Sequence, residues 1–409
     1  MKISYNKGIT LVALVVTIVV LLILAGVSIN LVLGENGLIN NAKEAKNKTL
    51  QAEKDDEESM DATANWIIQN VANLPQTTET KPYIPSSEFS QLEGTNLSNG
   101  LVIQDREGNQ YVWIEVPMTE EVYPTTGLEI TEFNADIYTK IEDDLHKYVK
   151  EYNKTKFSDE YCKDDTDGWF KNEEEYNMQK YKMLKSVYQN GGFWVGRYEA
   201  GIEKNRTKSG EATEIPQSKA NLFPYNYVTR TQAKKLAEKV KYDEYSGSLM
   251  FGVQWDLMLK FIEVKMYTID ANIITKLNQD STTIGNYINA EYTINRGKYT
   301  KYNFTSTWYD YGDELDGIVK NKVKMKQDAK DKGVLLTTGA ADRNCLMNIY
   351  DVAGNIWEWT LEYSHIDGGT CADRGGSYYT TGKNNPANYH YANPVNYNYV
   401  SFGFRISIY

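Results

Sequence analysis

The sequence predicts an α+β fold behind a long N-terminal helix, and three observations support this prediction. Residues 9–34 contain no charged side chain and form one continuous apolar run. Between that run and Pro75, apolar residues recur at helical spacing. From about Leu101 onward, short β-branched and aromatic segments are mixed with helical patterns but do not alternate with them as a parallel βαβ sheet requires.

Composition limits the classes of function. The 409 residues suffice for a stem and one large or two ordinary domains. The mean hydropathy is −0.55, the net charge is −11 and the pI is about 5.1. Nothing in this composition supplies a basic surface that could neutralise phosphates, so we expect no nucleic-acid partner.

The chain has three cysteines, too few for a disulfide scaffold or a zinc site, namely Cys162, Cys345 and Cys371. At most one bridge can form, and we expect it between Cys345 and Cys371. Three inert thiols are the alternative.

The segment Ile9–Leu33 is long enough to cross the hydrocarbon core of a bilayer as a helix. Lys2 and Lys7 precede it and should stay cytoplasmic, so the rest of the chain should lie outside the cell. The run is longer than the core of a secretory signal, and no small-x-small cleavage pattern clearly follows it. The sequence therefore predicts a membrane anchor with an extracellular head.

The six residues K-G-I-T-L-V from Lys7 resemble the N-terminus of type IV prepilins and pseudopilins. The resemblance implies a bacterial protein with a leader, residues 1–8, cleaved between Gly8 and Ile9, and methylation of the new N-terminus. Residues 9–75 would then form the membrane-spanning, pilin-like stem. Ala13 stands where the family usually has glutamate, which fits a minor subunit or a protein that stays in the membrane. A plain single-pass anchor is the alternative.

Residues 76–96 are rich in Thr, Ser, Pro and Asn and are expected to form a linker to a head that spans 97–409. Within the head, residues 101–116 predict two strands around a turn at Gly108, and residues 191–201 predict another strand. Residues 138–183 are charged and predict a helical insertion. Helices are also expected from Thr229 and, in the core, around Trp255.

Three motifs identify the head more closely: A-G-N-I-W-E-W from Ala353, R-G-G-S-Y from Arg374 and G-F-R from Gly403. Together they resemble the formylglycine-generating enzyme family, also called the sulfatase-modifying factor domain, over roughly residues 97–409 with insertions. The resemblance implies a C-type-lectin-like fold. The motifs are specific to the fold and not to its chemistry.

Physical reasoning assigns these motifs a structural role. Trp357 and Trp359 alternate with their neighbours along an extended segment, so both should lie on one face. The glycines permit tight turns or close backbone approach. Arg374 and Arg405 suit buried bidentate pairs with Asp351 and Glu358.

The resembled family's oxidase chemistry requires a cysteine pair after R-G-G-S, and no cysteine follows Ser377 here. A copper site made of thiolates is therefore not expected. A related branch holds iron with histidines, but His146, His365 and His390 are far apart in the sequence. We expect no enzymatic activity, with a divergent metal-dependent oxidase as an alternative.

The resemblance also implies oxygen ligands for calcium, for which Asn355 and Glu358 are the candidates. No other cofactor is expected.

Residues 378–401 replace the missing cysteine pair with tyrosine and asparagine. Flat aromatic area combined with adaptable amide hydrogen bonds suits a ligand-binding surface. The flanking motifs would display this segment on a rigid scaffold. The predicted binding residues are Tyr378, Tyr379, Asn384, Asn385, Asn388, Tyr389, His390, Tyr391, Asn393, Asn396, Tyr397, Asn398 and Tyr399.

This segment resembles the variable segments of ligand-binding proteins that diversity-generating retroelements mutate at asparagine codons. An AT-rich genome, which enriches Asn and Tyr along a whole chain, is the alternative explanation. The sequence thus predicts a membrane- or pilus-anchored extracellular protein that binds a protein or glycan, with a structural minor pilin or pseudopilin as the alternative.

Overall fold

A computed structural model describes residues 80–163, 169–301, 306–312, 324–326 and 333–409. The chain divides into two units, 1–75 and 76–409, and all described residues belong to the second, the head. The predicted leader with Gly8 and Ile9, the membrane segment and the stem lie outside the described residues. Among the residues that are described, no helix is long and apolar enough to cross a membrane.

The larger sheet of the head has seven strands in the order β1-β2-β3-β5-β21-β9-β8, and all its neighbours pair antiparallel. The C-terminal strand β21 lies between β5 and β9, so the last residues hold the early part of the head to its middle. The strands are β1 Ser90–Gln91, β2 Val102–Gln104, β3 Gln110–Glu115, β5 Gly192–Gly196, β8 Lys241–Tyr242, β9 Tyr245–Ser248 and β21 Ser407–Ile408.

A five-stranded sheet contains the residues of the sequence motifs. Its order is β19-β18-β17-β20, and β4 also pairs with β17. The strands are β4 Phe157–Ser158, β17 Trp357–Ile366, β18 Gly369–Arg374, β19 His390–Asn393 and β20 Phe402–Phe404. β17 and β20 pair in parallel, whereas the other pairs are antiparallel. The sheet therefore brings the W-E-W, R-G-G-S and G-F-R motifs together.

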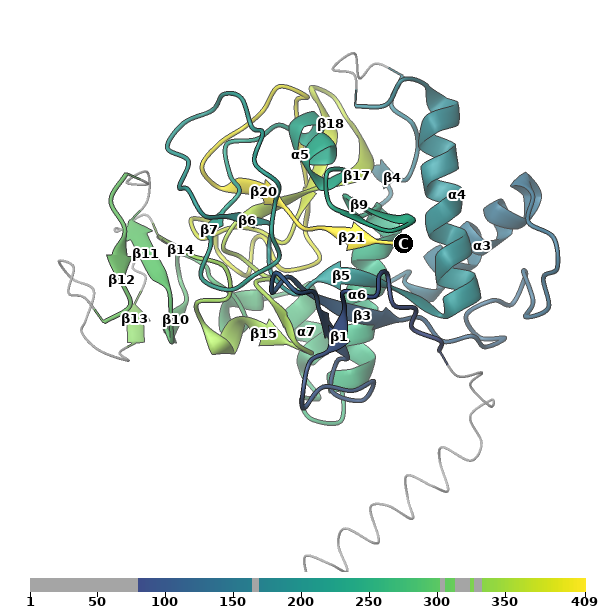
Figure 1. The fold of residues 1–409 in the computed structure, drawn as a ribbon, viewed down its shortest axis with the longest axis horizontal. Coiled ribbons are helices and arrows are strands. Elements are labelled where there is room, and N and C mark those ends of the chain that lie inside the picture. The colour runs from purple at the N-terminus through teal and green to yellow at the C-terminus, as the bar shows by residue number, and fades with distance from the viewer. Residues whose placement is uncertain (1–79, 164–168, 302–305, 313–323, 327–332) are drawn as a thin grey trace, which may run out of the picture. The chain divides into compact units, whose positions relative to one another are not determined.

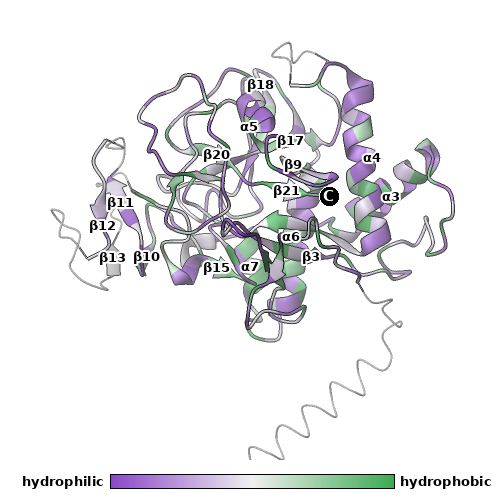
Figure 2. Ribbon diagram, viewed as in Figure 1, coloured by the Kyte–Doolittle hydropathy of each residue, from purple (hydrophilic) through white to green (hydrophobic). Residues whose placement is uncertain are grey.

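The α-helices of the described residues are α3 Ala135–Tyr148, α4 Glu173–Asn190, α5 Arg230–Ala237, α6 Gly252–Met266 and α7 Ile273–Asn278. The predicted charged insertion forms α3 and α4, which pack side by side (Figure 1). Thr229 caps α5, as the sequence predicted, and forms a capping box with Gln232. Trp255 is fully buried, which confirms that α6 is a core helix. In Figure 2, hydrophobic residues recur along α6, whereas much of α4 is hydrophilic.

Smaller ladders occupy the region around residues 201–350. They are β6 Gly201–Ile202 with β7 Phe223–Pro224, β10 Glu291–Thr293 with β13 Lys324–Lys326, β15 Cys345–Leu346 with β16 Ile349–Tyr350, and β11 Lys298–Lys301 between β12 Tyr309–Asp310 and β14 Val334–Leu336. Within the described part of this region, 3₁₀ turns lie at Ser281–Thr283 and Asp342–Asn344. The head is thus a mixed, sheet-rich α and β structure, in agreement with the predicted mixture of elements.

The described part of the expected linker, residues 80–96, packs on the rest of the head. Phe89 is buried in the core and β1 pairs with β2. The Tyr83 hydroxyl donates to the Ile408 carbonyl at 2.7 Å, and Trp113 Nε1 donates to Thr80 Oγ1 at 2.9 Å. The polar composition of this stretch concealed two aromatic anchors, Tyr83 and Phe89.

The expected disulfide between Cys345 and Cys371 is wrong. Cys345 lies in β15 and Cys371 in β18, which belong to different sheets. All three cysteines are described, and none of them forms a disulfide. Burial raises the pKa of the Cys345 thiol to about 11, so this thiol is protonated and poorly nucleophilic at neutral pH.

Candidate functional site

The five-stranded sheet presents two chemically different faces. Asp373 is in register with Trp359 and Tyr391, whereas Arg374 is in register with Glu358 and His390. Because residues in register share a face and successive residues alternate, these two rows lie on opposite sides of the sheet. One side is aromatic around Asp373, and the other is polar around Arg374.

We call Tyr379, Tyr389, Tyr391 and Tyr397, which surround the buried Trp357, the tyrosine face. The rings of Tyr391 and Tyr389 lie 5.5 and 6.0 Å from the Trp357 ring, and the Tyr391 ring stacks on it. Tyr397 packs edge-on against Phe402, 4.9 Å away, and Phe402 in turn packs against Trp357. Tyr391 remains 45% exposed. The buried rings of Trp357 and Phe402 therefore hold the partly exposed tyrosine rings in place.

The structure divides the predicted binding residues into three groups. Three of these residues are exposed, namely Asn384, Tyr391 and Asn396. Six are half-buried, namely Tyr379, Asn385, Tyr389, Tyr397, Asn398 and Tyr399. The buried group consists of Tyr378, Asn388, His390 and Asn393, and their direct contact with a ligand stays a prediction. Tyr378 packs with Leu335, Ile356 and Val400, and the other three take part in hydrogen bonds inside the sheet region.

Asp373 lies fully buried among these aromatic residues. Its Oδ2 accepts a 2.8 Å hydrogen bond from Asn393 Nδ2, but its buried Oδ1 has no hydrogen-bond partner among the described residues. Burial raises the pKa of the Asp373 carboxyl well above its usual value. Burial also raises the pKa of Tyr379, Tyr389 and Tyr397, and the Asp373 charge adds to each rise.

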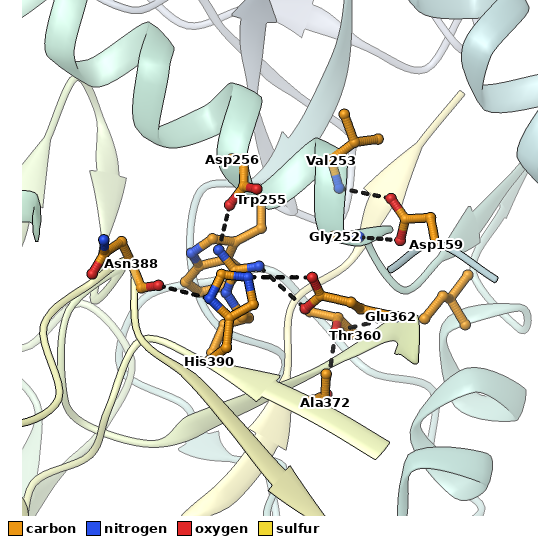
Figure 3. Close-up of polar contacts among 12 residues, drawn as sticks. Asp159, Gly252, Val253, Trp255, Asp256, Thr360, Glu362, Ala372, Asn388 and His390 are labelled. Atoms are coloured by element: carbon orange, nitrogen blue, oxygen red, sulfur yellow. Dashed lines mark hydrogen bonds and ion pairs between the residues drawn. The ribbon is translucent and has the colours of Figure 1, made fainter. Parts of the chain in front are cut away.

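On the opposite side of the sheet, Arg374 connects three structural elements. It is completely buried, donates from Nη1 to Glu362 Oε2 at 3.2 Å, and forms a second ion pair with Asp256 of α6. His390 Nε2 lies 3.2 Å from Glu362 Oε1, and His390 Nδ1 lies 3.0 Å from the Asn388 carbonyl oxygen (Figure 3). Burial would raise the pKa of Glu362, but His390 and Arg374 lower it below the usual value.

A cavity of about 610 Å³ adjoins this network, and its lining includes Asp256 and Glu362. Asp159, also in the lining, accepts hydrogen bonds from the backbone N–H groups of Gly252 and Val253 at 2.7 and 2.8 Å (Figure 3). It thereby satisfies the first N–H groups of α6. Burial, followed by repulsion from Glu362, raises the pKa of Asp159 to about 6.

At this cavity Glu142, His146 and Asp159 offer ligand atoms that lie within 4.8 Å of one another. Sequence reasoning missed the cluster because no local pattern connects Asp159, which follows β4, to Glu142 and His146, although the i,i+4 spacing of these two residues on one helix was a usable signal. Lys180 Nζ lies 2.9 Å from Glu142 Oε2 and donates to the Asp159 carbonyl at 2.9 Å. A lysine thus already supplies positive charge here.

The three histidines, which are distant in sequence, all lie near residues 157–160. His146 is close to Asp159, His365 Nε2 lies 2.8 Å from Ser158 Oγ, and the His390 ring lies 4.8 Å from the Phe157 ring. They do not share one ligand set: the metal-ligand cluster of the described residues contains only His146.

The side-chain oxygen atoms of the proposed calcium ligands already accept hydrogen bonds within the protein. Asn355 Oδ1 accepts from Asn286 Nδ2 and from the Leu336 N–H, at 3.0 and 3.1 Å. Both carboxylate oxygens of Glu358 accept from Arg405, at 2.6 and 3.1 Å. A calcium ion would have to replace these donors, and its binding stays a prediction.

The predicted pairing of Arg405 with Glu358 is therefore confirmed. The predicted pairing of Arg374 with Asp351 or Glu358 is wrong, because Arg374 pairs with Asp256 and Glu362.

Comparisons with known proteins give little further guidance. No family model and no curated protein matches the chain. Among solved structures, the chain is similar to CarF, with a TM-score of 0.31 and 12% identity over 53% of this chain and 85% of that one. It is also similar to Treponema denticola variable protein 1, with a TM-score of 0.26 and 12% identity over 53% and 84%. Neither likeness is close enough to carry an argument.

Proposed function

We propose that this chain is a membrane- or pilus-anchored extracellular binding protein whose head captures a protein or glycan ligand. The observation that carries the proposal is the tyrosine face itself: Tyr391 is 45% exposed while its ring stacks on the buried Trp357. A tyrosine held in this way offers contact area with little loss of conformational entropy on binding. Exposed Asn384 and Asn396 add adaptable hydrogen-bonding groups in the same segment.

The proposed scaffold is a C-type-lectin-like head related to formylglycine-generating enzymes but without their catalysis. The absence of cysteine after Ser377 supports this proposal. The position of Cys345 and Cys371 in separate sheets supports it further, because the family's copper site needs an adjacent pair of thiolates.

The proposed location follows from the N-terminal sequence alone. Ile9–Leu33 would hold the protein in a bacterial membrane, and cleavage after Gly8 would allow entry into a pilus. Diversification of residues 378–401 by a retroelement belongs to the same proposal. A structural minor pilin or pseudopilin remains the alternative, in which the head would be a spacer.

The direct test of binding is Tyr391→Ala in the full-length protein purified in mild detergent. A random peptide library and a glycan array, both screened on the wild-type protein, supply ligands. We expect the variant to lose about tenfold or more in affinity, because tyrosines at the centre of interfaces commonly contribute about 2 kcal/mol. Surface plasmon resonance measures the affinities.

Tyr267→Ala is the matched control, because Tyr267 is a 54% exposed tyrosine that caps the end of α6 and is not part of the tyrosine face. It should bind every selected ligand as the wild type does. Selected ligands that bind Tyr391→Ala with undiminished affinity would contradict the assignment of the tyrosine face.

A second candidate function, a divergent metal-dependent oxidase, is favoured only by the cluster of Glu142, His146 and Asp159 beside the cavity. We expect elemental analysis of the purified full-length protein to find less than about 0.1 copper or iron per chain, since Lys180 already compensates this cluster. Near-stoichiometric metal that disappears in His146→Ala would support the oxidase instead. Equal metal content in His365→Ala would confirm that the effect is local.

A further inference from the structure

We propose that the tyrosine face binds a positively charged side chain of a protein partner, lysine or arginine, and that Asp373 is the acceptor that recognises it. The inference rests on the proposed function and specifies its ligand class. It starts from one unsatisfied group, the buried Asp373 Oδ1, and from the aromatic rings around that carboxyl.

Asp373 lacks what a buried carboxylate ordinarily has. Buried polar groups in folded proteins are almost always hydrogen-bonded, and buried charges are paired. Asp373 has one partner, Asn393 Nδ2 on Oδ2, and none on Oδ1. None of the ion pairs among the described residues includes it, and the adjacent Arg374 is engaged by Asp256 and Glu362 on the other side of the sheet.

The surroundings of Asp373 suit a cation. Cations are attracted to the faces of aromatic rings, and Trp357 and Tyr391 provide stacked rings on the same side of the sheet as Asp373. The Asp373 charge contributes to the raised pKa of Tyr379, Tyr389 and Tyr397. The partly exposed Tyr391 therefore offers ring area to an incoming cation on the side of the sheet where Asp373 lies.

The open acceptor distinguishes between kinds of cation. Oδ1 needs a hydrogen-bond donor, which a quaternary ammonium cannot supply and an ammonium or guanidinium can. Common glycans are neutral or acidic, whereas lysine and arginine are abundant on protein surfaces. The net charge of −11 also favours association with a positively charged protein. These considerations point to a protein ligand.

Binding of the cation should depend on pH. The charged groups that act on Asp373 are Arg374, which favours its ionised form, and Glu362, which opposes it. Burial outweighs both and keeps the carboxyl protonated above its usual range, so cation binding must release that proton. The affinity should consequently rise as the pH increases through the raised pKa of Asp373, while lysine and arginine stay charged.

The test uses Nα-acetyl-lysine N-methylamide and Nα-acetyl-arginine N-methylamide as probes of the full-length protein. The neutral Nα-acetyl-norleucine N-methylamide and tetramethylammonium are controls. Tryptophan fluorescence or calorimetry at millimolar concentrations should show binding of the two charged amides about ten- to a hundredfold tighter than of norleucine amide. In Asp373→Asn, which preserves the shape and the contact with Asn393, this preference should disappear.

A second measurement separates recognition from a structural role. The raised pKa of Asp373 means that its contribution to stability is complete below its unfolded value of 3.8 and is lost as pH rises. Asp373→Asn should therefore be at least as stable as the wild type at pH 8, by thermal unfolding. Lost cation preference together with retained stability supports the proposal.

Three results would overturn it in different ways. Equal binding of the norleucine and lysine amides, or an unchanged preference in Asp373→Asn, removes Asp373 as the acceptor. Binding of the charged amides without any selected peptide that requires Lys or Arg leaves a small-amine site and removes the protein partner. Library ligands that need Tyr391 but carry no essential cation preserve the proposed function and refute only this inference.

Discussion

Arg374→Met should destabilise the head by about 3–5 kcal/mol, because it removes the arginine that pairs with both Asp256 and Glu362. Methionine fills similar space, so the loss reflects carboxylates left buried without their cation and not a cavity. Arg374, Asp256 and Glu362 come from β18, α6 and β17, so the damage should spread across the core. Chemical denaturation of the full-length protein in mild detergent, followed by tryptophan fluorescence, measures the change.

The effect should shrink on acidification. Arg374 and His390 lower the pKa of Glu362, so the Glu362 contribution is present above its unfolded pKa of 4.5 and is lost as pH falls through the folded value. Without Arg374, His390 still opposes the effect of burial on Glu362, so that contribution should be smaller at neutral pH. The difference between the two proteins should thus be large at pH 7 and smaller near pH 4.

Lys171→Met is the matched control for Arg374→Met. It removes an ion pair with Glu175 that is 3.8 Å long, and the Lys171 side chain is 88% exposed. Such surface pairs contribute little, so the control should change stability by less than about 1 kcal/mol at either pH. A loss from Arg374→Met as small as that of the control would show that the buried network does not hold the core.

The sequence predicted the elements that depend on local patterns. Thr229 and Gln232 formed a capping box, and the apolar run around Trp255 formed a core helix. Trp357 and Trp359 shared a face because alternation along a strand is a local rule. Pairings between distant segments were harder to predict. Arg405 pairs with Glu358 as expected, but Arg374 pairs with Asp256 and Glu362, which no nearby motif indicated.

The sequence likewise predicted only part of the candidate site. Composition located the segment 378–401 but could not distinguish exposed Tyr391 from buried Tyr378, because that distinction depends on how the segment folds over β17 and β20. Asp373 gave no signal at all, since one aspartate before R-G-G-S has no pattern. Its importance emerges only from the strand register that places it with Tyr391.

Gly354→Ala should be the most damaging small substitution in the A-G-N motif. Gly354 has φ +76°, where a side chain costs about 1–2 kcal/mol. A Cβ there would lie 2.1 Å from the Asn286 carbonyl oxygen, 2.6 Å from its carbon and 2.8 Å from the Asn286 nitrogen. These are backbone atoms, so relief requires the two segments to separate. A total loss of about 3 kcal/mol or more is expected.

Separation of these segments would also affect the contacts of Asn355. The Asn355 N–H donates to the Asn286 carbonyl at 2.9 Å, and the two side-chain amides are joined at 3.0 Å. Hydrogen exchange of the Asn355 amide in Gly354→Ala should therefore accelerate even where the protein remains folded.

Gly94→Ala is the control that separates the conformational part of this cost from the steric part. Gly94 has φ +79°, nearly the same backbone conformation, but a Cβ there would meet no atom within 4 Å. It should lose only the conformational 1–2 kcal/mol. The difference between the two variants measures how closely the A-G-N turn approaches residues 285–287. Equal losses of stability in Gly354→Ala and Gly94→Ala would mean that Gly354 is needed only for its backbone conformation. The close approach of the motif to Asn286 would then add nothing to the cost of the substitution.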